Sequence, residues 1–206
     1  MNRATHFAAL SLAVCIYALP DQCTADEIPQ KEMRLLEQAP DGRVTSRTLT
    51  QEELTFVKSD DGPIDGHIEN SSDQPILVYG PKPAAGYRFD NALYILPAGT
   101  KTPEDFDYDG VFLPSDRTAD GREEKPPFAA KISSDKDGEV TGVTDSKYTI
   151  KVTRLGFPVS FDVVVQGTGQ GKVNWAIPSK DADVFTQSQI TQLAQGGSLT
   201  TAYKIK

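Results

Sequence analysis

The clearest chemical pattern in the chain is a twelve-residue acidic segment, DFDYDGVFLPSD. Asp105, Asp107 and Asp109 alternate, a glycine follows them, and Asp116 stands at the twelfth position. This spacing fits the calcium-loop pattern D-x-D-x-D-G with an acid six residues after the glycine. Calcium takes six to eight oxygen ligands, so these carboxylates can converge on one ion while the backbone carbonyl of Val111 supplies another oxygen. The sequence therefore predicts a structural calcium site at these five residues.

The same segment also has the alternation of a half-buried strand, with Phe106 and Tyr108 facing inward. Three carboxylates would then lie on one face, about 6.6 Å apart along the strand, and repel one another. The flanks differ from those of an EF-hand, because prolines lie in 97–103 and at Pro114, where the two helices would be. Leu113, at the ninth position, supplies no side-chain oxygen. We therefore expect either an isolated calcium loop between strands or a plain half-buried strand.

Patterns that indicate catalysis are weaker. If a signal peptide ending at Ala25 is removed, both cysteines leave with it, and His67 is the only histidine of the mature chain. A cysteine nucleophile and a metal site with two histidines are then excluded, and a Ser-His-Asp mechanism would have to use His67. Paired carboxylates would suit an extracellular hydrolase, and Glu69, Glu104 and Glu139 are candidates.

Charge and composition narrow the classes of partner. The 206 residues include 29 acidic and 21 basic side chains, which gives a net charge of −8. A protein that neutralises phosphates needs a basic surface, so we expect no nucleic-acid partner. With 38% apolar residues, a chain of this length can bury a core and suits a single domain.

The first 25 residues have the organisation of a secretory signal peptide. Arg3 supplies a positive charge, an apolar run extends over Phe7–Leu19, and Ala25 is a small residue at the expected cleavage site. The run has 13 residues, which is shorter than the roughly 18 that a spanning helix needs. We therefore expect a secreted or periplasmic mature chain without membrane insertion. An uncleaved anchor and a lipid anchor on Cys15 or Cys23 are the alternatives.

From residue 44 onward, short runs rich in Val, Ile, Thr and aromatic residues alternate with turn signals. This predicts a mainly β fold, an antiparallel β-sandwich or an open barrel, with one short helix at 183–195 before a last strand at 198–205. Asp137-Gly138 predicts a hairpin between the strands on either side of it. The other expected strands are 66–70, 75–79, 92–96, 128–132, 140–143, 148–155, 159–166 and 172–177.

The segment between the signal peptide and the sandwich is polar. Its one helical candidate is Lys31–Gln38, which offers few side chains to bury, so we expect a tether or a loosely docked helix. The predicted organisation is therefore a signal peptide at 1–25, a polar tether at 26–43 and a single sandwich domain at 44–206.

No motif specifies a reaction, so the functional expectation comes from export, fold and the acidic loop. We expect a secreted or periplasmic, non-catalytic β-sandwich that binds a carbohydrate, an envelope component or a protein, with a calcium-binding loop. Seven aromatic residues between Tyr79 and Phe112 suit stacking on sugars if they are exposed, and core packing otherwise. The alternatives are an extracellular hydrolase that uses paired carboxylates and a membrane-active, toxin-like sandwich.

Overall fold

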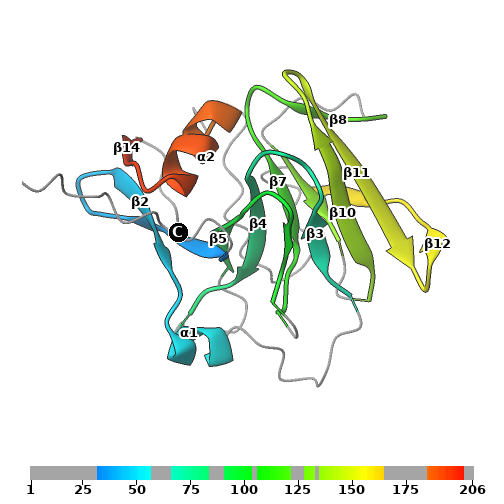
Figure 1. Cartoon of the computed structure of the whole chain (residues 1–206), viewed down its shortest axis with the longest axis horizontal. Coiled ribbons are helices and arrows are strands. Elements are labelled where there is room, and N and C mark those ends of the chain that lie inside the picture. The colour runs from blue at the N-terminus through cyan, green and yellow to red at the C-terminus, as the bar shows by residue number, and fades with distance from the viewer. Residues whose placement is uncertain are drawn as a thin grey trace, which may run out of the picture.

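The computed structural model describes residues 32–56, 66–83, 91–103, 106–121, 128–132, 135–164 and 185–201. Within these ranges the chain forms two β-sheets and two short helices (Figure 1). The mainly β, sandwich-like fold predicted from the sequence is thereby confirmed. The elements are β1 (Arg34–Gln38), β2 (Arg43–Thr48), α1 (Gln51–Phe56), β3 (Ile68–Asn70), β4 (Ile76–Pro81), β5 (Asn91–Leu96), β6 (Thr100–Lys101), β7 (Gly110–Leu113), β8 (Thr118–Ala119), β9 (Phe128–Lys131), β10 (Asp137–Val143), β11 (Lys147–Arg154), β12 (Phe157–Pro158), β13 (Asp162–Val164), α2 (Gln187–Ala194) and β14 (Leu199–Thr200).

The larger sheet has the strand order β13-β9-β7-β4-β5-β1-β2-β14, and its described pairs are antiparallel. The smaller sheet has the order β12-β11-β10-β3-β6, with β8 also beside β11. β10 runs parallel to β3 and β11 runs parallel to β8, so the smaller sheet is mixed. Two short strands therefore cover the outer edge of β11, and Pro158 in β12 lacks the N–H that another strand would need for pairing.

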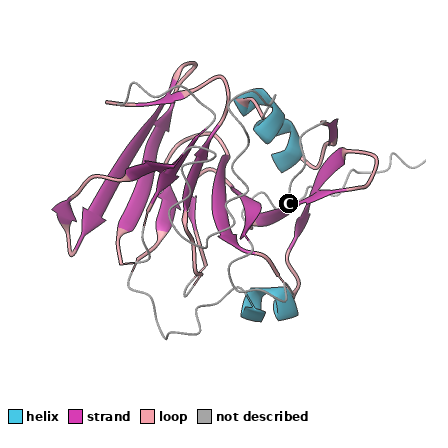
Figure 2. Ribbon diagram, turned by 180° about the vertical axis from the view of Figure 1, so that it is seen from behind, coloured by secondary structure: helices cyan, strands magenta, loops and turns pink. Residues whose placement is uncertain are grey.

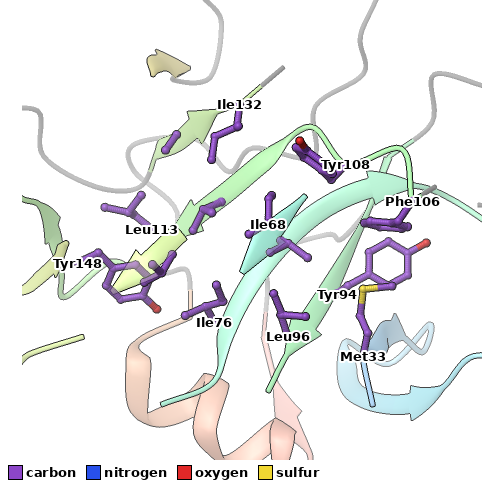
Figure 3. Close-up of a cluster of buried hydrophobic side chains, with 14 of the residues drawn as sticks. Met33, Ile68, Ile76, Tyr94, Leu96, Phe106, Tyr108, Leu113, Ile132 and Tyr148 are labelled. Carbon is purple, nitrogen blue, oxygen red and sulfur yellow. The ribbon is translucent and has the colours of Figure 1, made fainter. Parts of the chain in front are cut away.

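The larger sheet is covered on both faces, and β4 is consequently buried at every position. Side chains alternate along a strand, so Ile76 and Val78 enter the core between the two sheets, whereas Leu77 and Tyr79 enter a second core beneath α2. Figure 3 shows the first of these cores, where Ile76 lies among side chains from both sheets. The molecule therefore has three layers: the smaller sheet, the larger sheet and α2.

The helix α2, at Gln187–Ala194, lies within the range 183–195 that the sequence predicts, and it begins at Gln187 instead of at 183. Thr186 and Gln189 form a reciprocal capping box: the Thr186 hydroxyl accepts from the Gln189 N–H, and the Gln189 side chain accepts from the Thr186 N–H. Gly196, with φ of 80°, follows the end of the helix. Ile190 and Leu193 are buried against the larger sheet. Figure 2 shows α2 on the same side of the molecule as β2 and β14.

The prediction of a helix or tether at Lys31–Gln38 is wrong for residues 34–38, because these residues form β1 between β2 and β5. Leu35 and Leu36 explain the difference. As neighbours in a strand they point to opposite faces, and Leu35 enters the core between the sheets while Leu36 enters the core beneath α2. A short surface helix would bury only one stripe of its side chains. The sandwich therefore includes part of the predicted tether.

The hairpin predicted at Asp137-Gly138 is also wrong. The strands on either side, β9 and β10, belong to different sheets, and Asp137 and Gly138 are the first residues of β10. A Cβ on Gly138 would lie 2.6 Å from Cδ1 of Ile132, so this glycine allows close packing of the chain. The structure confirms strands within the predicted ranges 66–70, 75–79, 92–96, 128–132, 140–143, 148–155 and 159–166, whereas the predicted strand 172–177 lies outside the described residues.

Candidate functional site

The described carboxylates of the predicted calcium site lie beyond opposite ends of β7. Asp107 and Asp109 precede the strand and Asp116 follows it, while Val111 is buried within it and paired on both sides. A strand of four residues is about 13 Å long and does not wrap around an ion. Within the described ranges no group of three acidic, histidine or cysteine side chains is placed to hold a metal ion. Asp105 lies outside those ranges, so calcium at Asp105, Asp107 and Asp109 stays a prediction.

Asp116 binds to the start of α2. Its Oδ1 accepts a hydrogen bond from the backbone N–H of Gln187 at 2.9 Å, and its Oδ2 lies 2.5 Å from Nη1 of Arg117. The N-terminus of a helix carries a partial positive charge and unpaired N–H groups, which a carboxylate stabilises. Asp116 therefore connects the end of β7 to the helix, a role that the sequence pattern does not reveal.

The aromatic residues around the acidic segment belong to the core. Phe106 and Tyr108 are each 1% exposed, as the strand-like alternation predicts, and the ring of Phe106 packs edge to face on Tyr94 with centroids 5.3 Å apart (Figure 3). Tyr79 and Phe112 form a similar pair at 5.9 Å in the core beneath α2. An exposed aromatic platform for sugars is therefore wrong for these five residues, and the other two aromatic residues of the window, at positions 87 and 89, lie outside the described ranges.

The histidine lies in a network of surface charges. Nδ1 of His67 is 3.1 Å from Oδ1 of Asp137, and Nε2 is 3.7 Å from Oε2 of Glu69. Glu69 also stands beside Glu139 on the neighbouring strand, with Lys101 and Lys151 on the outer sides of the two glutamates. This row of charges crosses the solvent face of the smaller sheet, where opposite charges on adjacent strands stabilise pairing. Glu69 and Glu139 repel each other across the two strands, and each has a lysine on its other side that offsets this repulsion. Glu104 lies outside the described residues.

An apolar tip projects from the end of the smaller sheet at which Asp137 pairs with Thr153. The strands β11 and β12 are joined by the two residues Leu155 and Gly156, whose φ values are 51° and 78°. Two positive φ values are those of a type I′ hairpin turn, for which Asn-Gly is the favoured sequence. Leu155 is 84% exposed and Phe157 is 73% exposed, and the nearby Val159 is also exposed. We call these three side chains the hairpin tip.

A cavity of about 320 Å³ opens at the C-terminal end of α2. Its walls come from β1, β5, the turn before β4 and the last turn of the helix. Arg34 lines it and is only 8% exposed. Burial lowers the pKa of the Arg34 guanidinium, since the charged form loses water, and the charge of Glu32 opposes this shift. No sequence pattern indicates this site, because a single arginine in a polar segment is usually exposed.

Neither of the two helices in the described part of the chain could span a lipid bilayer. Comparisons with models of protein families, with curated proteins and with solved structures found no significant match to this chain. The geometry of the described residues offers two candidate sites, the hairpin tip and the Arg34 cavity.

Proposed function

We propose that the chain is an exported, non-catalytic β-sandwich that binds a protein partner through the hairpin tip. The observation that carries this proposal is the exposure of Leu155, at 84%, in a backbone conformation that leucine rarely adopts. A left-handed conformation costs a residue with a Cβ roughly 1–2 kcal/mol. The exposed side chain gains no packing within the described part of the chain to offset that cost, so the leucine suits contact with another molecule.

The composition of the tip favours a protein over a sugar or a membrane. Sugars stack on flat aromatic surfaces, but the tip has a single ring, that of Phe157, and the described aromatic residues near the acidic segment are buried. Burying Leu155 and Phe157 contributes about 1.5–3 kcal/mol each, which is too little for stable membrane anchoring. A pocket on a protein can receive two such side chains as a central anchor.

The tip is also held firmly. β11 pairs with both β10 and β12, and the N–H of Val159 donates to the carbonyl of Val152 at 2.9 Å beyond the last strand pair. Arg154, at the base of the turn, forms an ion pair with Asp135 at 2.8 Å. An anchor that is already ordered loses less conformational entropy on binding. Export, the other half of the proposal, is supported by the signal-peptide pattern of residues 1–25.

Site-specific cross-linking tests the proposal. A photoreactive phenylalanine replaces Phe157, and in a matched chain it replaces Thr149 on the outer face of β11. In cells that export the chain, we expect position 157 to form one adduct of defined mass. This adduct should disappear when the same chain also carries Leu155→Asn. No adduct, or the same adducts from position 149, would contradict the proposal. Sedimentation with anionic lipid vesicles checks the membrane alternative, and co-sedimentation that depends on Phe157 would replace the protein partner by a lipid surface.

A further inference from the structure

The cavity at the end of α2 contains the largely buried guanidinium of Arg34, on which Glu32 acts through its charge without a direct ion pair. Arg34 donates from Nε to the hydroxyl of Ser46 at 2.9 Å and from Nη2 to the carbonyl of Ser46 at 2.8 Å. No described carboxylate lies within ion-pair distance of it. Charged groups that are removed from water are normally paired, so this guanidinium suits an external anion.

The guanidinium is oriented so that part of it remains available to a ligand. The Ser46 hydroxyl that accepts from Arg34 itself donates to the carbonyl of Leu193 at 2.6 Å, which fixes both side chains against the end of α2. Nη1 of Arg34 makes no hydrogen bond to a described residue. Among the described residues, only one side-chain nitrogen or oxygen is both inaccessible to solvent and without a hydrogen-bond partner, and that atom is Nε of Arg117. Nη1 of Arg34 is therefore accessible to solvent.

The walls of the cavity limit the size and charge of a ligand. About 320 Å³ is at the lower end of the range for small-molecule sites. Pro97 and Ala98 supply apolar surface, while Asp73 and Gln195 lie toward the exposed side. The carbonyl end of α2 carries a partial negative charge, and Asp73 adds a full one. A phosphate dianion would be repelled by these charges, whereas one carboxylate can pair with the guanidinium.

We propose that this cavity binds a small zwitterion of the amino-acid type, with its carboxylate on Arg34 and its ammonium group between Asp73 and the C-terminal end of α2. The apolar wall would hold a short aliphatic side chain. The geometry is independent of the hairpin tip, because the tip belongs to the smaller sheet and the cavity lies between the larger sheet and α2. One proposal can therefore fail while the other holds.

Three probes of matched shape test the ligand class. L-Leucine carries both charges, 4-methylpentanoate lacks the ammonium group and 3-methylbutylamine lacks the carboxylate. Each is titrated into the full chain, and binding is followed by the chemical shifts of backbone amides and of arginine Nε–H groups. We expect L-leucine to shift the Arg34 Nε–H and the amides of Ala98 and Thr191. We expect 4-methylpentanoate to bind about tenfold more weakly and the amine not to bind.

Variants locate the site. Arg34→Gln should abolish binding; since it also removes two hydrogen bonds, Ala98→Phe provides a second test, because it fills the exposed side of the cavity and leaves Arg34 in place. Asp73→Asn should reduce the affinity for L-leucine to that for 4-methylpentanoate. Arg43→Gln on β2, an exposed arginine, is the matched control and should change nothing. No shifts with L-leucine, shifts that survive Ala98→Phe, or equal binding of the amine would overturn the proposal.

Discussion

The carboxylate of Asp116 and the backbone N–H of Gln187 are joined by a hydrogen bond of 2.9 Å, although 71 positions separate them in the chain. Gln187 is itself a buried polar residue: its Nε2 donates to the carbonyl of Pro75 at 2.8 Å, and its Oε1 accepts from the hydroxyl of Tyr148 at 2.5 Å. The first residue of α2 thus connects the helix to β7, to the start of β4 and to β11. Tertiary contacts of this kind stabilise a helix of only eight residues.

Asp116→Ala should destabilise the fold by about 1–2 kcal/mol, because it removes an acceptor and a negative charge from the helix N-terminus. Urea unfolding measures the change. Asp120→Ala is the control, since the carboxylate of Asp120 forms an exposed pair with Lys147 at 3.4 Å, whose loss should cost less than about 0.5 kcal/mol. Equal destabilisation by the two substitutions would show that the contact with α2 contributes nothing specific.

Calcium binding, which the acidic segment predicts, should not depend on Asp116. Its carboxylate is bound at the far end of β7, whereas Asp107 and Asp109 lie before the strand. Calorimetric titration of the unaltered chain, of Asp107→Ala and of Asp116→Ala separates the residues. We expect any calcium heat to be lost with Asp107→Ala and kept with Asp116→Ala. Loss in both variants would require a loop that wraps the ion, and no heat in the unaltered chain would remove the calcium prediction.

Leu155→Asn should stabilise the protein by about 1 kcal/mol, because asparagine tolerates positive φ in a type I′ turn better than leucine does. For a chain of this size that is a rise in Tm of about 2–4 °C. Calorimetry measures it, and Phe157→Ser, which alters the tip without altering its φ, should leave the Tm within about 1 °C. A lower Tm for Leu155→Asn would show that the leucine stabilises the folded chain, and the argument for a binding role would lose its basis.

The sequence predicted the parts of the fold that depend on local patterns. Alternation and turn residues indicated most of the described strands, and the apolar pattern indicated a helix at 183–195, a range that contains α2. It did not predict which sheet each strand joins. Asp137-Gly138 has the composition of a hairpin turn, but the partners of β10 are β3 and β11, and β3 is far away in the chain. Strand pairing is decided by long-range packing, which local patterns do not encode.

The candidate sites were hidden from sequence analysis for different physical reasons. The acidic pattern describes side-chain spacing, but the backbone from Gly110 to Leu113 extends between two neighbouring strands instead of turning. Leu155 precedes a glycine in a turn, and only the observed φ shows that the leucine occupies an unfavourable position. Arg34 becomes a candidate because Ser46 and the end of α2 surround it, and both come from other parts of the chain.

Gly80→Ala should destabilise the protein by about 1–3 kcal/mol, since a Cβ there would lie 2.1 Å from Cζ of Phe106. The ring of Phe106 is 1% exposed and packs on Tyr94, so it has no free space to move into. Gly142→Ala in β10 is the control: its nearest atom beyond its chain neighbours, Oγ1 of Thr149, would be 3.9 Å away, which is ordinary contact. Urea unfolding compares them, and similar stabilities would indicate that the ring can shift.

Stability at acid pH should depend on Glu53. Two hydrogen bonds from Arg47, at 2.6 and 2.7 Å, and one from the N–H of Thr50 lower the pKa of the Glu53 carboxyl to about 2. In the unfolded chain that pKa is near its ordinary value of about 4.3. Because the pKa of Glu53 is lower in the folded chain than in the unfolded chain, its ionised carboxylate stabilises the folded state at pH values above the unfolded pKa. This stabilisation is lost as the pH falls from about 4 to about 2.

Glu53→Gln should therefore cost about 1–2 kcal/mol at pH 7, a value reduced for partial exposure of the pair, and close to nothing at pH 2. Unfolding by urea at pH 7, 4 and 2 measures the difference between the two chains. Glu52→Gln, at the exposed neighbouring position in the first turn of α1, is the control and should differ little from the unaltered chain at any pH. If Glu53→Gln destabilised the protein equally at pH 7 and at pH 2, the loss would come from altered packing rather than from the missing charge. The ion pair with Arg47 would then not stabilise the fold.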